Sequence, residues 1–468
     1  MPRRTETPEQ PAEVPFLPQF DLLQSSLPNK PPFCSGTLST TAEDLLLFYG
    51  KDPKACRFLN FTQASSDEVT HLAQTCDVAS FGLNQQDVVD ESYRKAGKLD
   101  GAHFATKFHL ENSGLLNIVR DAILEGDQAT LPIKAEPYKI NVYGPGSFFK
   151  AHKDTPRAEN MFGSLVLIYP TTHSGGSLVF RDNGDEWTFD SAAAVQVNSV
   201  STPCIGYAAF FADVEHEVLP VQTGYRVTLT YNLYFDNKTN VPASIPAHVP
   251  LTYTHTKPKL AFEYVLADPN FLPSGGLLGF GLRRQYPVKT YGYWDRKTVK
   301  YPLRDIPLKG TDALLMQSCR ELGLNAQLKC LYTEDTDYDI DGVLVDTPYG
   351  DFGMVDSDLL YKIYKDAPNM RIVSVMVPNS HGPTDPKRRC VDVGDRKLKD
   401  LPGRPRRTVF WVTEPTEYSQ ATTDYTAYGN EASPALAYGD LCLIVEVGPP
   451  GARSIPLPVV DDSKMEDD

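Results

Sequence analysis

Between residues 138 and 235 the chain alternates short β-rich runs with turn residues, and this pattern constrains the fold more than any other feature of the sequence. Clusters of glycine, proline and asparagine, such as the segments 144–146 and 183–184, separate the runs. Many short strands with frequent turns are typical of two packed antiparallel sheets, so the segment predicts a β-sandwich or jelly roll. The predicted strands span residues 138–143, 164–169, 177–180, 187–189, 193–197, 207–211, 216–221 and 225–235.

The regions on either side of these strands have different patterns of apolar and turn residues. Before residue 138, helical spacing and capping signals predict three helices, which begin near residues 40, 66 and 114. After residue 250, strand-like runs, the first at residues 260–266, mix with one clear helix at 312–322. The chain is therefore predicted to be α+β and mainly β. Its predicted parts are a flexible proline-rich arm over 1–38, a core domain with helical support over 39–240, a mixed β/α domain over 251–455 and an acidic tail over 456–468.

Charge and cysteine usage limit the partners of the chain. The formal net charge is −15, and an acidic surface repels phosphate backbones, so no nucleic-acid partner is expected. No apolar run reaches the roughly 18 to 20 residues of a membrane helix, and no signal peptide is evident, so no membrane partner is expected. The eight cysteines are scattered without a C-x-x-C pair. This spacing favours reduced thiols in a cytoplasmic or nuclear protein.

Three residues stand out as candidate metal ligands. His152 and Asp154 are two positions apart, so on an extended segment their side chains point the same way. His216 begins a later strand, which a jelly roll can bring back beside the first. Two histidines and one carboxylate on one face of a metal form the facial triad of non-haem Fe(II) oxygenases. An H-x-D triplet alone is common by chance, so the sequence elsewhere has to support this hypothesis.

Arg226 provides that support. It lies ten residues after His216 in an otherwise apolar strand, where a buried charge needs a partner. A guanidinium suits a carboxylate in a bidentate geometry, and Thr228 on the same strand face adds a hydroxyl. An internal Arg–Asp pair is the structural alternative. Lys150, Arg157 and Arg181 are expected to flank the mouth of the barrel, where they are candidates for substrate contact.

The segment from Tyr138 to Phe235 resembles the iron- and 2-oxoglutarate-dependent dioxygenases of the prolyl 4-hydroxylase type. Residues 143–154 resemble the opening metal-binding strand and loop of that family, and residues 174–179 resemble its central Gly-Gly hairpin. Residues 216–220, followed by Arg226, resemble its closing signature. Residues 88–94 are also similar to fungal members of the family.

The resemblance implies a double-stranded β-helix core in which His152, Asp154 and His216 bind Fe(II). It implies that Arg226 pairs with the distal carboxylate of 2-oxoglutarate. Tyr143, Tyr169 and Thr228 are then further candidates for the cosubstrate pocket, although ordinary packing also explains the two tyrosines. The implied reaction consumes dioxygen and 2-oxoglutarate and hydroxylates a C–H bond, with ascorbate as a candidate reductant. A carboxylate at position 154 favours hydroxylation over halogenation.

The substrate stays open at this point. The family suggests prolyl or another peptide side chain, but small-molecule oxidation uses the same metal residues. A non-enzymatic scaffold that retains the fold is a competing class, and intact metal residues together with Arg226 argue against it. A cupin-like metalloenzyme that uses no 2-oxo acid is a third alternative.

Overall fold

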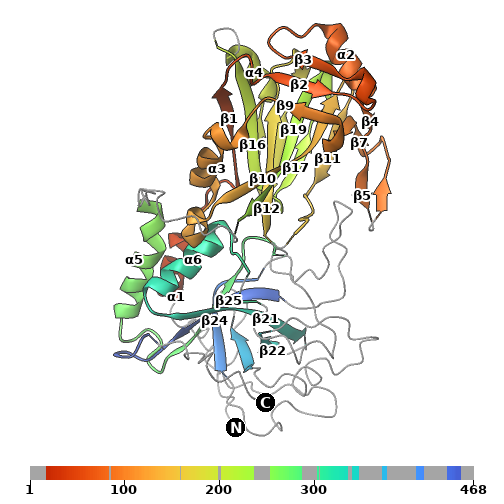
Figure 1. Ribbon diagram of the computed structural model, residues 1–468. Helices are drawn as coiled ribbons and strands as arrows, with labels where there is room; N and C mark the ends of the chain where they lie inside the picture. Colours follow the sequence, from red (N-terminus) through yellow and green to blue (C-terminus); the bar gives the residue numbers. More distant parts are fainter. Residues whose placement is uncertain are drawn as a thin grey trace, which may run out of the picture.

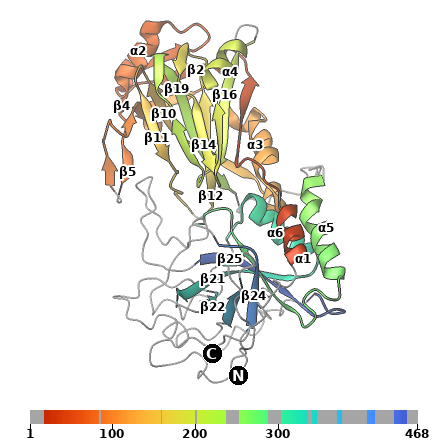
Figure 2. The ribbon, with the colours of Figure 1, turned by 180° about the vertical axis from the view of Figure 1, so that it is seen from behind.

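The computed structural model describes residues 17–83, 86–158, 160–198, 202–236, 253–286, 303–304, 306–335, 340–346, 371–376, 407–415 and 440–454. Figures 1 and 2 show two units, one above the other. The N-terminal unit, residues 33–235, contains one large hydrophobic core. The C-terminal unit comprises residues 253–454 and the first helix of the chain, and it has cores of its own.

Two antiparallel sheets make up the centre of the N-terminal unit, so the jelly-roll prediction is confirmed. The larger sheet has the order β1 (Phe33–Ser39), β16 (Cys204–Phe211), β12 (Met161–Ile168), β19 (Arg226–Phe235), β10 (Ile133–Tyr143), β8 (Gly97–Asp100), β4 (Asp77–Val78). The smaller sheet has the order β15 (Asp185–Phe189), β14 (Leu178–Asp182), β17 (Glu215–Val218), β11 (Phe148–His152), β7 (Arg94–Lys95).

Strand β19 shows why the sequence folds into this layered form. Its apolar positions, such as Val227 and Leu229, are fully buried in the core, whereas Arg226, Thr228 and Thr230 alternate with them and line a cavity. Successive side chains of a strand point to opposite faces, so one strand serves both layers. Two of the predicted helices support the larger sheet: α2 (Ser66–Thr75) contacts β8 and β10, and α3 (Leu115–Ile123) contacts β1. A further helix, α4 (Ser191–Asn198), contacts β1 and β16 and was not predicted as a helix.

Several smaller elements complete the N-terminal unit. A three-stranded sheet has the order β3 (Arg57–Asn60), β2 (Leu46–Tyr49), β9 (Phe104–Thr106). Two two-stranded sheets pair β5 (Phe81–Leu83) with β6 (Gln86–Val88), and β13 (His173–Gly175) with β18 (Val221–Gly224). Short 3-10 helices span Pro53–Ala55, Gly101–His103, Leu110–Asn112 and Gly126–Thr130.

The C-terminal unit is a closed barrel flanked by helices, in agreement with a mixed β-rich domain. Its strand order is β20 (Gly276–Gly281), β24 (Arg407–Thr413), β23 (Arg371–Met376), β22 (Ile340–Val345), β21 (Asn325–Asp335), β25 (Asp440–Val447). Helices α1 (Leu17–Ser26), α5 (Tyr253–Ala267) and α6 (Gly310–Glu321) lie side by side beside it (Figures 1 and 2). No helix in the described ranges is long and apolar enough to cross a bilayer.

Residues 17–38 do not form the flexible arm that the prolines indicated. Helix α1 buries Phe20 and Leu23 in the core of the C-terminal unit, and β1 pairs with β16 in the larger sheet. Apolar contacts far away in the sequence therefore order this segment despite its prolines. The rest of the predicted arm, residues 1–16, and the predicted tail at 456–468 lie outside the described residues.

Three local predictions of secondary structure were wrong, because contacts with other elements outweighed the local spacing of apolar residues. The segment at 46–49, predicted as part of a helix, is strand β2, which β3 and β9 pair on both sides. The segment at 193–197, predicted as a strand, lies in helix α4, where Ala192 and Val195 are buried at helical spacing. The segment at 260–266 lies in helix α5, which buries Phe262 and Val265 and leaves Tyr264 exposed.

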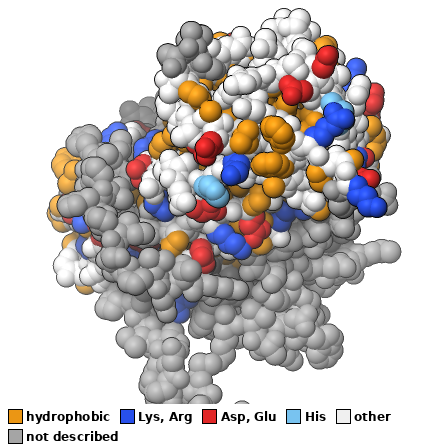
Figure 3. All heavy atoms as spheres, turned by 45° about the horizontal axis from the view of Figure 1, so that its top comes forward, with side chains coloured by type: hydrophobic (Ala, Val, Ile, Leu, Met, Phe, Trp, Pro, Cys, Tyr) orange, Lys and Arg blue, Asp and Glu red, His pale blue; other side chains and the backbone are white. Residues whose placement is uncertain are grey.

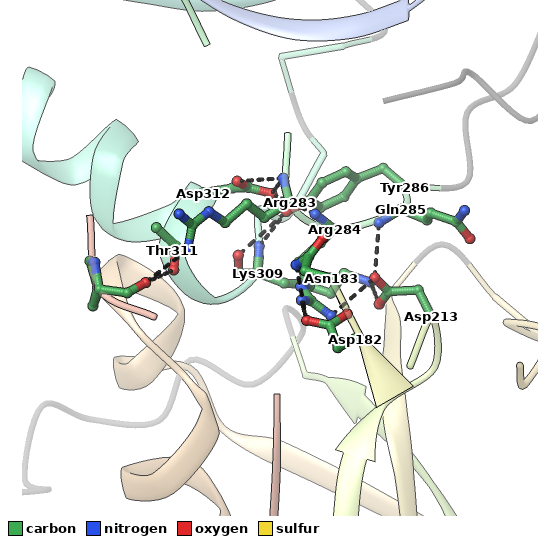
Figure 4. A network of polar contacts seen from close by, with 11 residues as sticks. Asp182, Asn183, Asp213, Arg283, Arg284, Gln285, Tyr286, Lys309, Thr311 and Asp312 are labelled. Atoms are coloured by element: carbon green, nitrogen blue, oxygen red, sulfur yellow. Dashed lines mark hydrogen bonds and ion pairs between the residues drawn. The ribbon is translucent and has the colours of Figure 1, made fainter. Parts of the chain in front are cut away.

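Buried ion pairs join the two units. Arg284 and Lys309 of the C-terminal unit contact Asp182 and Asp213 of the N-terminal unit, and all four side chains are buried (Figure 4). The exterior is different: Figure 3 shows acidic and basic side chains interspersed with hydrophobic ones on the upper face of the molecule. Among the described cysteines all are free, and Cys390 lies outside the described residues.

Candidate metal centre and adjoining cavity

The three predicted metal ligands come together between strands of the smaller sheet. His152 ends β11 and His216 lies on β17, and the antiparallel register places these two residues directly opposite each other. One ligand atom from each of His152, Asp154 and His216 lies within 4.8 Å of the others. The Nε2 atom of His216 is 3.9 Å from Oδ1 of Asp154. The sequence hypothesis of a His-Asp-His cluster is thus borne out in space.

Hydrogen bonds fix both imidazole rings in the orientation that a metal site needs. Nδ1 of His152 donates to the carbonyl oxygen of Lys150 at 2.7 Å, and Nδ1 of His216 donates to that of Val214 at 3.0 Å. A carbonyl only accepts, so each Nδ1 carries a proton, and Nε2 is the ring nitrogen that remains available to a metal. Outer hydrogen bonds of this kind set the tautomer and the direction of metal-binding histidines.

Asp154 is oriented in the same way. Ser164 on β12 donates its hydroxyl to Oδ2 of Asp154 at 2.5 Å, and this serine is buried. The hydrogen bond occupies one carboxylate oxygen and leaves Oδ1 facing His216. The serine was missed at the sequence level, because it lies in another strand ten residues later and nothing local marks it.

The surroundings keep His152 neutral. Phe149 stacks on its ring with centroids 3.6 Å apart, and burial holds the pKa of His152 well below its ordinary value, with His216 lowering it further. A neutral imidazole is the form that binds a metal ion. Two imidazoles and a carboxylate that converge on one point fit a divalent transition metal such as Fe(II).

A cavity of about 310 Å³ adjoins the triad between the two sheets. Arg226, the first residue of β19, lines it and is 1% exposed. Its Nε donates to Ser191 Oγ at 3.4 Å, and its Nη2 has no hydrogen-bond partner among the described residues. Burial lowers the pKa of Arg226 to about 10, with Tyr143 acting in the opposite direction. The internal Arg–Asp pair considered from the sequence is not found in the described part of the chain.

The Gly-Gly turn of the sequence motif shapes the wall beside Arg226. Gly176 has a φ of +71°, and a Cβ atom there would lie 2.9 Å from both Arg226 Cδ and Val221 Cγ2. Gly175 has a φ of +74°, and a Cβ there would lie 2.5 Å from the carbonyl oxygen of Pro220. Both positions therefore require glycine for backbone conformation and for space.

The other predicted pocket residues divide into two groups. Tyr143 lies opposite Arg226 in the β10–β19 register and lines the cavity, with the guanidinium 5.5 Å from its ring centroid. Thr228 lines the cavity as well, and its hydroxyl donates to the carbonyl oxygen of Asn141 at 3.5 Å. Tyr169 does not reach the cavity: it stacks on Phe61 and shares a hydrogen bond with Thr106 at 3.2 Å. Burial raises the pKa of Tyr169 to about 12.

Basic side chains that the sequence did not single out also line the cavity. Arg94 of β7 is buried and donates to Asn141 Oδ1 at 2.8 Å, and Lys139 lies two residues before Asn141 on β10. One signal in the sequence could have revealed this side of the cavity, namely the polar residues at every second position of β10, Lys139, Asn141 and Tyr143. Of the residues expected at the mouth, Arg157 lines the cavity, whereas Lys150 is exposed outside it and Arg181 pairs with Glu186 and Glu217.

Residues 138–234 match the family model described as the 2OG-Fe(II) oxygenase superfamily. The match includes the whole triad, the Gly-Gly turn and Arg226. The chain therefore carries an iron- and 2-oxoglutarate-dependent dioxygenase domain, as its motifs predicted. The likeness to fungal members stays a prediction, and no curated protein matched the chain.

Solved structures with a similar fold include two prolyl hydroxylases. A Pseudomonas putida prolyl-4-hydroxylase is 17% identical, covering 47% of this chain and 99% of its own, with a TM-score of 0.24. A Trichoplax adhaerens prolyl hydroxylase, in complex with a hypoxia inducible factor peptide fragment, is 15% identical, covering 47% and 90%, with a TM-score of 0.28. A Burkholderia pseudomallei oxidoreductase of the 2OG-Fe(II) oxygenase family is 16% identical, covering 36% and 79%, with a TM-score of 0.21. At such TM-scores these likenesses do not bear on the substrate.

Proposed function

We propose that this chain hydroxylates a C–H bond of a peptide side chain, prolyl among the candidates, with 2-oxoglutarate as cosubstrate. One oxygen atom of O₂ enters the C–H bond, and the other enters succinate as 2-oxoglutarate loses CO₂. Bound Fe(II) would supply the redox chemistry by which the two atoms of O₂ enter the two products. The observation that carries the proposal is Arg226, a buried cation in the same cavity as the triad, whose Nη2 has no hydrogen-bond partner among the described residues.

The residues of the chain have distinct roles in this proposal. His152, Asp154 and His216 would hold Fe(II), and all three line the cavity. Arg226 binds the distal carboxylate of 2-oxoglutarate, because a buried guanidinium with neutral neighbours gains most from an anionic partner. Tyr143 and Thr228 border the same position. The motif resemblance supports a peptide substrate and ascorbate as reductant, and the free cysteines support a cytoplasmic or nuclear setting.

The test is anaerobic addition of Fe(II) and 2-oxoglutarate to the full chain, with the visible charge-transfer band of the chelate as readout. We expect a band that depends on both additions. It should vanish in His216→Ala and persist in His109→Ala, since His109 is exposed and lies outside the cavity. A folded, metal-binding protein without the band would overturn the proposal in favour of a scaffold or a cupin-like enzyme.

A further inference from the structure

We propose that the substrate carries an anionic group, a carboxylate or a phosphate, which binds a basic pocket formed by Arg94, Lys139 and Arg157. These three residues line the same cavity as the triad, and along β10 Lys139 is four residues away from Tyr143, which pairs with Arg226. The inference rests on the proposed function, because it assigns the cavity beyond the cosubstrate to the molecule that is hydroxylated.

The strand register separates the basic pocket from the cosubstrate position. Along β10, Tyr143 lies opposite Arg226, and Lys139 lies opposite Thr230. Four residues of extended strand span about 13 Å. The five-carbon chain of 2-oxoglutarate has four C–C bonds of about 1.5 Å each, so it reaches at most about 6 Å. A molecule held at Arg226 therefore ends well before Lys139.

The same register places the basic pocket beside the metal ligands. Ser164, which holds Asp154, lies opposite Asn232 on β19, two residues beyond Thr230. Lys139 is therefore two residues along β19 from the position that faces Ser164, and Lys139 and Asp154 are close enough for their charges to interact. Arg94 reaches the triad from the other sheet: its guanidinium lies 4.3 Å from the centroid of Phe149, which stacks on His152. An anion here is close to the metal without occupying the ligand positions.

A β-bulge builds the pocket. The β10–β19 register passes from Pro137 directly to Lys139, so Tyr138 is an extra residue on β10. Tyr138 and Lys139 consequently both line the cavity, although they are neighbours in the chain. The ring of Tyr138 is shared by two cations, with Lys139 Nζ at 4.5 Å and the Arg157 guanidinium at 4.3 Å from its centroid. Arg157 also donates to the Tyr138 hydroxyl.

Basic side chains outnumber carboxylates in the described lining of the cavity. Among its described lining residues, five are basic and two carry carboxylates, and one of these, Asp154, is a metal ligand. The other, Asp100, is exposed and pairs with Lys98 at 3.8 Å. The five basic residues of this lining are Arg94, Lys98, Lys139, Arg157 and Arg226.

Arg94 shows the imbalance most clearly. It is 3% exposed, it donates to two neutral acceptors, the Ser80 carbonyl and Asn141 Oδ1, and its Nε has no partner within the described ranges. A buried cation without an anion is costly, and like charges nearby add to the cost. Burial, Arg94 and Arg157 together lower the pKa of Lys139. A bound anion relieves this repulsion, in a protein whose net charge is otherwise −15.

The test measures anion binding to the full chain with Fe(II) and 2-oxoglutarate under anaerobic conditions. The probes are three pools of random peptides around a fixed proline. The pools differ in the polar residues at the variable positions, which are Glu and Asp in the acidic pool, Gln and Asn in the neutral pool, and Lys and Arg in the basic pool. Citrate and phosphoserine form a small-molecule arm. The variants are Lys139→Gln and Arg157→Gln, with Lys134→Gln as control, because Lys134 is on the same strand but exposed and paired with Glu136.

We expect the acidic peptide pool or the small anions to bind preferentially, and the arm that binds identifies the source of the anionic group. Lys139→Gln and Arg157→Gln should each weaken this binding about tenfold or more, as expected when a charge-assisted hydrogen bond is lost, while Lys134→Gln leaves it unchanged. Equal binding of neutral or basic pools, or no binding of any anionic probe, overturns the inference. The chelate band, recorded in the same samples, reports separately whether the proposed function holds.

Discussion

Lys309 of the C-terminal unit donates to Asp213 of the N-terminal unit at 2.8 Å, and both side chains are buried (Figure 4). Asp213 also accepts from the backbone N–H of Gln285 at 3.0 Å. The next residue, Val214, offers the carbonyl that orients His216. The C-terminal unit therefore anchors the turn that leads directly into a metal ligand.

The Lys309–Asp213 pair should contribute much more to stability than an exposed pair of the same length. Lys309→Met leaves Asp213 buried without its nearest cation, which costs about 3 to 5 kcal/mol in free energy of unfolding. Lys259→Met is the matched control, because Lys259 contacts Glu321 at the same 2.8 Å but both side chains are exposed by a third or more. That change should cost below about 1 kcal/mol. Urea denaturation measures both free energies of unfolding. Equal losses in Lys309→Met and Lys259→Met would show that the contact between the units adds nothing beyond an exposed ion pair.

Asp213 should make stability depend on acid pH. Burial alone would raise its pKa, but Lys309 and Arg284 lower it to about 2, below the ordinary 3.8. A lowered carboxyl pKa stabilises the fold above the ordinary value, and this contribution is lost as pH falls toward 2. The difference in free energy of unfolding between the wild type and Asp213→Asn should therefore be constant from pH 7 to about pH 5 and shrink below about pH 4. Denaturation at several pH values measures it, and a difference independent of pH down to 3 would count against the ionised pair.

Arg226→Ala should weaken 2-oxoglutarate binding far more than Fe(II) binding. The variant removes the charge-assisted hydrogen bonds to the distal carboxylate, which are worth about 3 kcal/mol, or roughly a hundredfold in affinity. Titration of the chelate band with 2-oxoglutarate measures the change. Arg181→Ala is the control, because Arg181 forms ion pairs outside the cavity. Unchanged cosubstrate affinity in Arg226→Ala would remove Arg226 from this role.

Gly176→Ala and Gly184→Ala separate backbone strain from crowding of the pocket. Both glycines have positive φ, so each substitution carries the strain of about 1 to 2 kcal/mol. A Cβ at Gly184 meets nothing within 4 Å, whereas one at Gly176 lies 2.9 Å from Arg226 Cδ. We expect similar losses of stability from strain, an additional loss in Gly176→Ala, and weaker 2-oxoglutarate binding in that variant alone. Equal cosubstrate affinity in the two variants would show that Arg226 moves freely.

Ser164→Ala should weaken the metal site while leaving the histidines intact. Loss of the 2.5 Å hydrogen bond frees Asp154 to rotate, and such partners of metal ligands typically contribute 10- to 100-fold in metal affinity. Ser318→Ala is matched in burial, because its hydroxyl donates to the Leu314 carbonyl in α6. Isothermal titration with Fe(II) under anaerobic conditions distinguishes the variants. A Ser164→Ala protein with wild-type iron affinity would show that the triad orients Asp154 without it.

The sequence itself determined the chemical core of this protein. A period of two along 225–235 separates polar from apolar side chains, so it fixes both a buried strand and a wall of Arg226, Thr228 and Thr230. His152 and Asp154 share one face for the same local reason. Both features depend on neighbours within a few residues. The third ligand, His216, lies 62 residues after Asp154, and the jelly-roll pattern together with the family motifs predicted that it joins them.

The tertiary structure alone decided the rest. Arg94 joins the cavity from β7, Ser164 reaches Asp154 from another strand, and Tyr169 faces Phe61 rather than the cavity. Helix α1 leaves the sequence neighbourhood of the first unit and packs on the second, and Lys309 finds Asp213 across 96 residues. Strand pairing and core packing bring such residues together, and these contacts leave little trace in the local sequence pattern. A local pattern determines which face a side chain occupies, but only the assembled sheets determine what lies opposite that face.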